Sequence, residues 1–165
     1  MDVTKLQAPF GVEDMEWRVQ QAGSTQQGKL WAIVVPYITN RAIQQRLDDV
    51  CGIDGWKNEY TSTPNDKGTL CGISILFKDR NDWITKWDGA EDTDIEAVKG
   101  GLSSAMKRAA VQWGIGRYLY KYEAAIVTPQ LDKPQSMDGW IMTQAKIGGK
   151  KQRIYYRVPQ LPKGE

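Results

Sequence analysis

The chain has 165 residues, of which 41% are hydrophobic and 25% charged, a composition typical of a soluble globular domain. It contains no histidine, which excludes Ser-His-Asp and Cys-His triads and histidine-ligated zinc. No apolar run could span a membrane and the N-terminus lacks a signal-peptide pattern. We therefore expect a cytoplasmic protein in which Cys51 and Cys71 are reduced, buried thiols.

Periodicity predicts strands, two helices and a closing hairpin along the chain. β-Branched and aromatic runs indicate the strands, and apolar residues at three- and four-residue spacing indicate the helices. After a loosely structured or helical segment 1–16, we expect strands at 17–21 and 29–38, a helix at 41–50, strands at 56–62, 69–77 and 83–87, a helix from about 94 to 113, a helical turn or strand at 117–123, a loop at 128–138, and a hairpin of 141–147 and 151–158.

Both helices have recognisable ends. Thr39 or Asn40 is placed to cap the first helix, and Gly52 to close it. Residues 93–96 match a capping box, which predicts that the second helix starts there, and two glycines follow Trp113 where it should end.

These elements predict an α+β fold. Three closely spaced strands joined by short loops indicate an antiparallel β-meander, which we expect to pack on the long helix as a β-β-β-α core. Extra strands and a helix precede this core, and a hairpin follows it. The expected divisions are an N-terminal segment 1–16, a core domain 17–127, and a C-terminal loop, hairpin and tail 128–165.

Charge is sorted along the chain although the total is only +2. Residues 1–60 carry a net charge of −2, residues 61–96 carry −4, and residues 97–165 carry +8. Such segregation is typical of a protein that binds a polyanion through one basic face. On charge alone, a solvated face that binds nothing is an equally good interpretation.

The second helix has two contrasting sides at 100° per residue. Its apolar residues fall in one stripe, which we expect to face the meander. The residues of this stripe are Ile95, Val98, Leu102, Ala105, Met106, Ala109 and Trp113. The other side has no acidic residue, and we expect it to be open to solvent and to contact phosphates. The alternative is that its glycines seat a neighbouring strand or subunit. The residues of this second side are Lys99, Gly100, Gly101, Ser103, Ser104, Lys107 and Arg108.

Two other motifs suggest different functions. Residues 23–30 fall one residue short of a P-loop, because Leu30 stands where Mg²⁺ binding needs a hydroxyl. We therefore predict a hairpin turn there and no ATPase. The acidic run Asp88–Glu96 could hold Mg²⁺ for a nuclease, or its carboxylates could simply favour a helix N-terminus. A protein-binding adaptor with a basic face is the remaining alternative.

Four segments resemble the Rad52 family of single-strand annealing proteins, in its phage Sak and DdrA-like branch. They are 36–56, 71–75, 83–90 and, most specifically, 99–120. The resemblance implies a non-enzymatic, ATP-independent protein that anneals complementary strands in recombination and repair, without a metal or cofactor. It also implies homo-oligomeric rings or filaments with single-stranded DNA in an outer groove, a single-strand-binding protein or exonuclease as a partner, and, for a phage protein, the cytoplasm of a bacterial host.

The resemblance also suggests which residues contact DNA. Lys107 and Arg108 match the family's basic pair on the long helix, and Arg41 is the nearest counterpart of a basic residue in the first helix. A second family arginine falls on Val111, and an aromatic falls on Ile53. Lys86, Lys99 and Arg117 are therefore added as substitutes, and Trp87 or Tyr118 as residues that could stack on bases.

Overall fold

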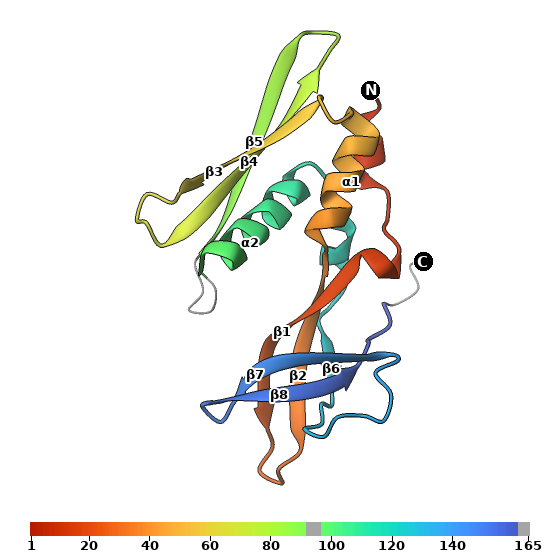
Figure 1. The fold of residues 1–165 in the computed structure, drawn as a ribbon, viewed down its shortest axis with the longest axis vertical. Coiled ribbons are helices and arrows are strands. Elements are labelled where there is room, and N and C mark those ends of the chain that lie inside the picture. Colours follow the sequence, from red (N-terminus) through yellow and green to blue (C-terminus); the bar gives the residue numbers. More distant parts are fainter. Residues whose placement is uncertain (92–96, 162–165) are drawn as a thin grey trace. The chain divides into compact units, whose positions relative to one another are not determined.

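The computed structural model describes residues 1–91 and 97–161, with backbone only at 97–99. The chain divides into two compact units, which are described separately below (Figure 1). Unit 1 is Met1–Met15 with Ile38–Leu119, and unit 2 is Glu16–Tyr37 with Tyr120–Glu165. The units alternate along the chain, whereas the division expected from the sequence is linear.

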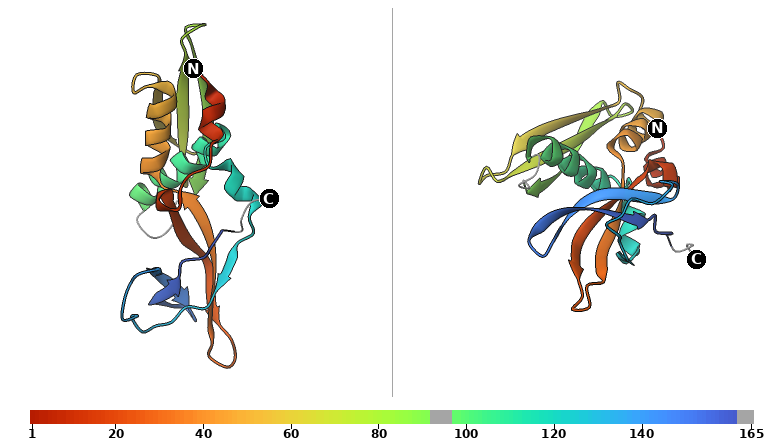
Figure 2. Two further views of the ribbon diagram at one scale, coloured as in Figure 1. Left: turned by 90° about the vertical axis from the view of Figure 1, so that its right-hand side faces the viewer. Right: turned by 60° about the horizontal axis from the view of Figure 1, so that its bottom comes forward.

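Unit 1 contains the predicted meander. Strands β3 (Trp56–Ser62), β4 (Gly68–Phe77) and β5 (Asp82–Glu91) form an antiparallel sheet in the order β3-β4-β5. Helix α2 (Ala97–Gln112) lies along one face of this sheet (Figures 1 and 2) and packs on β4 and β5. The predicted α+β class and the β-β-β-α core are confirmed, while the predicted capping box at 93–96 lies outside the described residues.

Helix α1 (Asn40–Cys51) packs against β3 and α2. Thr39 is its cap, because the Thr39 hydroxyl accepts a hydrogen bond from the Ala42 amide at 3.3 Å. Arg46 holds the N-terminal segment on this helix, donating to four of its backbone carbonyls and stacking 3.9 Å from the Phe10 ring centroid. Unit 1 also contains the 3₁₀ helices η1 (Val3–Gln7) and η2 (Val12–Asp14), and the 3₁₀ helix η3 (Arg117–Lys121) begins in unit 1 and ends in unit 2.

Unit 2 combines a three-stranded sheet with a hairpin. The sheet has the order β1-β2-β6, and the hairpin joins β7 to β8 through a turn at Gly148 and Gly149, both at positive φ. The inward residues of the hairpin pack on apolar side chains of β1 and β2. The strands are β1 (Met15–Ser24), β2 (Leu30–Ile38), β6 (Ala125–Val127), β7 (Trp140–Ile147) and β8 (Lys150–Arg157).

Most predicted elements are present with shifted ends. The turn between β1 and β2, at residues 25–29, joins two paired strands, which confirms the hairpin interpretation of the P-loop-like motif. Strand β6 was not predicted, because a three-residue strand is too short to show a periodicity. None of the helices in the described ranges combines the length and apolarity that a bilayer crossing requires.

Both cysteines are free, buried thiols, as expected. Burial raises the pKa of Cys71 to about 11, and burial together with the Asp48 carboxylate raises that of Cys51. Both thiols therefore stay protonated at neutral pH and serve the core as small apolar groups.

Gly116 is expected to be essential for the turn that follows α2. Gly116 has φ 71°, and a Cβ atom there would lie 2.8 Å from Cγ1 of the buried Ile38. We expect Gly116→Ala to lower the free energy of unfolding by about 2 kcal/mol, because left-handed strain adds to overpacking. Urea unfolding followed by circular dichroism measures the loss.

Gly52→Ala is the matched control, since Gly52 has φ 82° but its Cβ would meet only the tip of the exposed Asp54 side chain. This control should cost about 1 kcal/mol, the left-handed strain alone. Equal losses in the two variants would contradict a packing role for Gly116.

Candidate nucleic-acid interface

Helix α2 is fixed on the inner face of the meander by small residues and one indole. Ala105, Ala109 and Ala110 have no exposed surface, and Ile73 of β4 is also fully buried. The Trp113 indole N–H donates to the Ile73 carbonyl at 2.9 Å. The end of the helix is thereby tied to the central strand of the sheet.

Two cations converge on the last turn of α2. The Lys86 ammonium, from β5, donates to the Gln112 carbonyl at 3.1 Å. The Arg117 guanidinium donates to the same carbonyl at 2.9 Å and to the Val111 carbonyl at 2.8 Å. Helix carbonyls at a C-terminus lack partners within the helix and carry partial negative charge, so this end attracts cations from two other segments.

A third cation, Arg108, is held one turn earlier. Its Nε lies 3.3 Å from Oδ1 of Asp88 on β5, and its side chain is 55% exposed. The Gln112 amide donates to the other oxygen of Asp88 at 3.0 Å. Among the described residues, Nε is the one atom of Arg108 with a hydrogen bond to a carboxylate, so its terminal amino groups can still bind an anion.

We call Lys86, Arg108 and Arg117, with Asp88 and Gln112, the α2 cluster. The three cations are exposed on the surface of unit 1 and outnumber the single carboxylate. Lys86 also lies 4.6 Å from the centre of the Trp113 ring. The cluster therefore offers several N–H donors and a net positive charge on a fixed framework, which suits a phosphate-bearing ligand.

The Asp88 carboxylate stays ionised although it is partly buried. Burial by itself raises its pKa, but hydrogen bonds from Gln112, the Gly89 amide and Arg108 outweigh burial and leave the pKa below its ordinary value. Within the cluster, Asp88 therefore orients Arg108 and partly neutralises it.

The structure corrects the expected orientation of two residues. Lys107 was expected on the open side of α2, yet it is only 7% exposed and interacts within the protein. Gly101, also expected to be open, is buried, whereas Leu102 of the predicted apolar stripe is 37% exposed. Helix α2 packs on α1 as well as on the sheet, so a single apolar stripe does not describe all of its buried surface. The buried Gly101 favours the alternative in which glycine seats a neighbouring element.

Two predicted DNA contacts are not part of the cluster. Arg41 is exposed in the first turn of α1, and none of the described hydrogen bonds or ion pairs links it to the cluster. Lys99 lies in α2, but its side chain is outside the described residues.

The predicted stacking aromatics also lie elsewhere. Trp87 is 46% exposed, but strand alternation places it on the sheet face opposite α2, where its ring covers Gly72. The Tyr118 hydroxyl accepts a hydrogen bond from the Phe10 amide at 3.1 Å, which gives it a structural role.

The acidic run Asp88–Glu96 is only partly described. Asp88 is engaged by Arg108 and Gln112, Glu91 ends β5, and residues 92–96 lie outside the described part of the chain. Within the described ranges, no group of three His, Cys, Asp or Glu residues is placed to share a metal ion.

Sequence reasoning missed the residues that hold the cluster together. Gln112 and Arg108 are four residues apart on α2, so that both can reach one partner. This spacing was visible in the sequence, but the partner, Asp88, is brought to them by the sheet. Trp113, predicted only as a core residue, also supports Lys86 through its ring.

Comparisons with known proteins agree with this chemistry. A family model described as Rad52/22 family double-strand break repair protein matches residues 3–137. Two proteins named single-stranded DNA-binding protein DdrA, from Deinococcus deserti and Deinococcus radiodurans, are 36% and 35% identical over 125 residues. The matches cover 72% of this chain but only 57% and 55% of those relatives, so it spans little more than half their length. No solved structure gives a significant match.

The low pKa of Asp88 predicts an acid-labile contribution to stability. A carboxylate with a depressed pKa in the folded state stabilises the protein above its unfolded pKa, and this contribution is lost as pH falls through the folded pKa. We expect Asp88→Asn to lower the free energy of unfolding by about 1 kcal/mol at pH 7. The variant should also lose less stability than the wild type between about pH 5 and the acid limit of folding.

Glu91→Gln, on the same strand, is the control for removing one negative charge, because Glu91 is exposed and ends β5. Chemical denaturation at a series of pH values measures all three proteins. Identical pH profiles for the wild type and Asp88→Asn would contradict the proposed role of this carboxylate.

Proposed function

The chain belongs to the Rad52/22 family of double-strand break repair proteins, and from this premise we propose that it binds single-stranded DNA and anneals complementary strands without ATP. The α2 cluster is the observation that carries the proposal. It places three exposed cations around the end of the helix whose sequence most resembles the family.

The cluster is suited to phosphates rather than to bases. Its donors are guanidinium and ammonium groups, which recognise phosphate oxygens without reading sequence. Arg108 offers its terminal amino groups, and Lys86 and Arg117 are oriented by the carbonyls at the end of α2. A strand held by its backbone leaves its base edges free to test a second strand for complementarity.

Annealing then needs no bond-breaking group. Base pairing and stacking in the new duplex supply the driving force, and the protein contributes by neutralising phosphates that would otherwise repel each other. In this proposal Arg108 and Lys86 are the principal phosphate contacts, Arg117 assists them, and Asp88 limits the affinity so that the duplex can be released. Lys107 acts from inside the protein by supporting α2, while Arg41 and Lys99 remain candidate contacts.

We further propose that several copies act together. Three cations in one subunit can contact only a few nucleotides, so a useful length of strand requires a ring or filament of subunits. Within the described meander, β3 and β5 are edge strands, and Trp83 and Trp87 are partly exposed. These features make the meander of unit 1 a reasonable subunit contact.

Removing the two principal contacts should weaken binding strongly. The double variant Arg108→Gln with Lys86→Gln is expected to bind a fluorescent oligo-dT about 25-fold more weakly in 0.1 M salt. The physical reason is that each lost phosphate contact reduces the magnitude of the slope of log K against log salt by about 0.7. Two lost contacts therefore lower log K by about 1.4 at 0.1 M salt. Fluorescence anisotropy at several salt concentrations measures both the affinity and the slope.

The control is Lys57→Gln with Lys67→Gln, which removes the same charge from unit 1. Lys57 lies on the sheet face opposite α2, and Lys67 lies in the β3–β4 turn. Circular dichroism confirms folding in both variants. Equal losses would show that overall charge, and not the α2 cluster, governs binding.

The wild-type protein is expected to anneal complementary oligonucleotides faster than they anneal alone, with neither ATP nor Mg²⁺ present. A gel-based annealing assay measures this, and the same assay with Mg²⁺ tests the nuclease alternative. Binding without any acceleration would point to a storage or adaptor role, and shortened strands in the Mg²⁺ sample would favour the acidic run as a catalytic centre.

A further inference from the structure

The β7–β8 hairpin of unit 2 is strongly basic. Residues 140–157 contain five cations and no acidic residue. This hairpin lies beyond residues 3–137, which match the family, so the family resemblance assigns it no role. The five cations are Lys146, Lys150, Lys151, Arg153 and Arg157.

Strand pairing gathers four of these cations on one face. Lys146 is the register partner of Lys151, Gln144 of Arg153, and Trp140 of Arg157. Register partners in an antiparallel pair project to the same side, and alternate residues along a strand share that side. The alternate positions, including Ala145, Ile147, Ile154 and Tyr156, are buried in the core of unit 2. Lys146, Lys151, Arg153 and Arg157 therefore lie on the side away from that core, and we call these four cations the hairpin face. Tyr155 shares this side of β8 but is buried.

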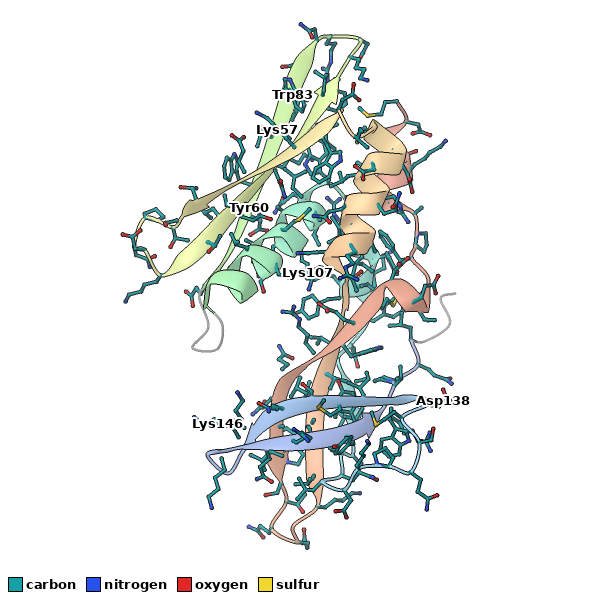
Figure 3. All side chains as sticks on the ribbon, viewed as in Figure 1. Lys57, Tyr60, Trp83, Lys107, Asp138 and Lys146 are labelled. Atoms are coloured by element: carbon teal, nitrogen blue, oxygen red, sulfur yellow. The ribbon has the colours of Figure 1, made fainter. Side chains whose placement is uncertain are left out.

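The cations of the hairpin face are exposed and carry no internal counter-charge. All five hairpin cations are exposed, and none forms an ion pair with a carboxylate within the described ranges. In Figure 3, Lys146 lies toward the turn of the hairpin and Asp138, the acidic residue before β7, lies at its opposite end. The hairpin face is thus a free basic surface, in contrast with the α2 cluster.

The arrangement is unfavourable for the fold itself. Like charges directly opposite each other on neighbouring strands destabilise a sheet, and here Lys146 faces Lys151. A basic pair of this kind is stabilised when an external anion binds between the two side chains. The hairpin face therefore has the character of a binding surface.

We propose that the hairpin face binds the phosphate backbone of single-stranded DNA as a second contact surface, separate from the α2 cluster. The proposal rests on the proposed function for the presence of DNA. Lys151 and Arg153 are adjacent outward positions of β8, and Arg157 follows four residues later, beyond the buried Tyr155. Because outward residues of a strand recur about every 6.6 Å, Lys151 and Arg153 can contact neighbouring phosphates of an extended strand, and Arg157 can contact one farther along.

The chemistry of the hairpin face favours a nucleic acid over a membrane. Met142 is the one large apolar side chain of the hairpin that is more than a third exposed, which is too little for insertion into lipid. Trp140 is only half-buried, with Arg157 4.5 Å from its ring centre, so the aromatic and the cation present one surface to a nucleotide.

The test compares two triple variants that remove the same charge from unit 2. The hairpin variant is Lys146→Gln, Lys151→Gln and Arg153→Gln. The control is Lys29→Gln, Lys121→Gln and Lys133→Gln, in which all three lysines are exposed outside the hairpin. Anisotropy with oligo-dT should show about 100-fold weaker binding for the hairpin variant in 0.1 M salt, with a salt slope smaller by about 2. The control should change far less.

A second measurement uses the unaltered protein and does not depend on how variants fold. Lysine acetylation followed by mass spectrometry should show protection of Lys146 and Lys151 by oligo-dT, while Lys29 and Lys133 stay reactive. Equal protection by poly-glutamate at the same charge concentration, or stronger protection by a blunt duplex, would overturn the assignment to single-stranded DNA.

The outcomes separate this inference from the proposed function. If the α2-cluster variant loses affinity while the hairpin variant matches its control and its lysines stay reactive, the hairpin proposal alone is wrong. If the wild-type protein binds no oligonucleotide, the proposed function fails and the hairpin proposal fails with it.

Discussion

Close contact between α2 and the meander determines where the charges of the candidate site can lie. Three buried positions of the helix, 105, 109 and 110, are alanines, while the larger Met106 contacts Asn58 of β3, so the helix can lie near the sheet. At that distance the Trp113 indole reaches the Ile73 carbonyl, which satisfies the polar group of a large buried side chain. The same proximity brings Lys86 of β5 to the final carbonyls of the helix. Bulkier side chains on this helix face would move Lys86 away from these carbonyls, and the α2 cluster would not form.

The cluster also shows how a cation can be fixed without being neutralised. Lys86 and Arg117 are oriented by backbone carbonyls, which carry only partial charges. Arg108 is oriented by a full carboxylate, but through one nitrogen only. In each case the side chain is restrained while most of its charge remains available. Lys107 illustrates the opposite case, because its burial requires its charge to be satisfied inside the protein.

The difference between these neighbours explains what sequence could and could not predict. Local signals were sufficient for the elements: Thr39 caps α1, and a Gly-Gly pair closes the β7–β8 hairpin, as the residue types indicated. A helical wheel, however, describes one helix against one surface. It could not anticipate that α2 also contacts α1, and it placed in solvent Lys107 and Gly101, which the structure buries. Asp88 was likewise invisible as a partner of Arg108, since their contact depends on strand register.

The same limitation hid the hairpin face. The five cations of the hairpin were counted in the positive charge of residues 97–165, but only the pairing of β7 with β8 places four of them on one side. Residue composition establishes that a segment is basic, and register decides whether its charges add at one surface or cancel between two.

The two basic surfaces differ in the entropy that a ligand must remove. Cations of the α2 cluster are already restrained, so a phosphate that binds them immobilises little additional side-chain freedom. The lysines of the hairpin face are unrestrained, and ordering such a side chain costs up to about 2 kcal/mol. If both proposals hold, the α2 cluster suits a strand held in a fixed position, and the hairpin face suits a looser contact that exchanges quickly. An annealing protein needs both properties, because one strand must be presented while another is sampled and released until its bases match.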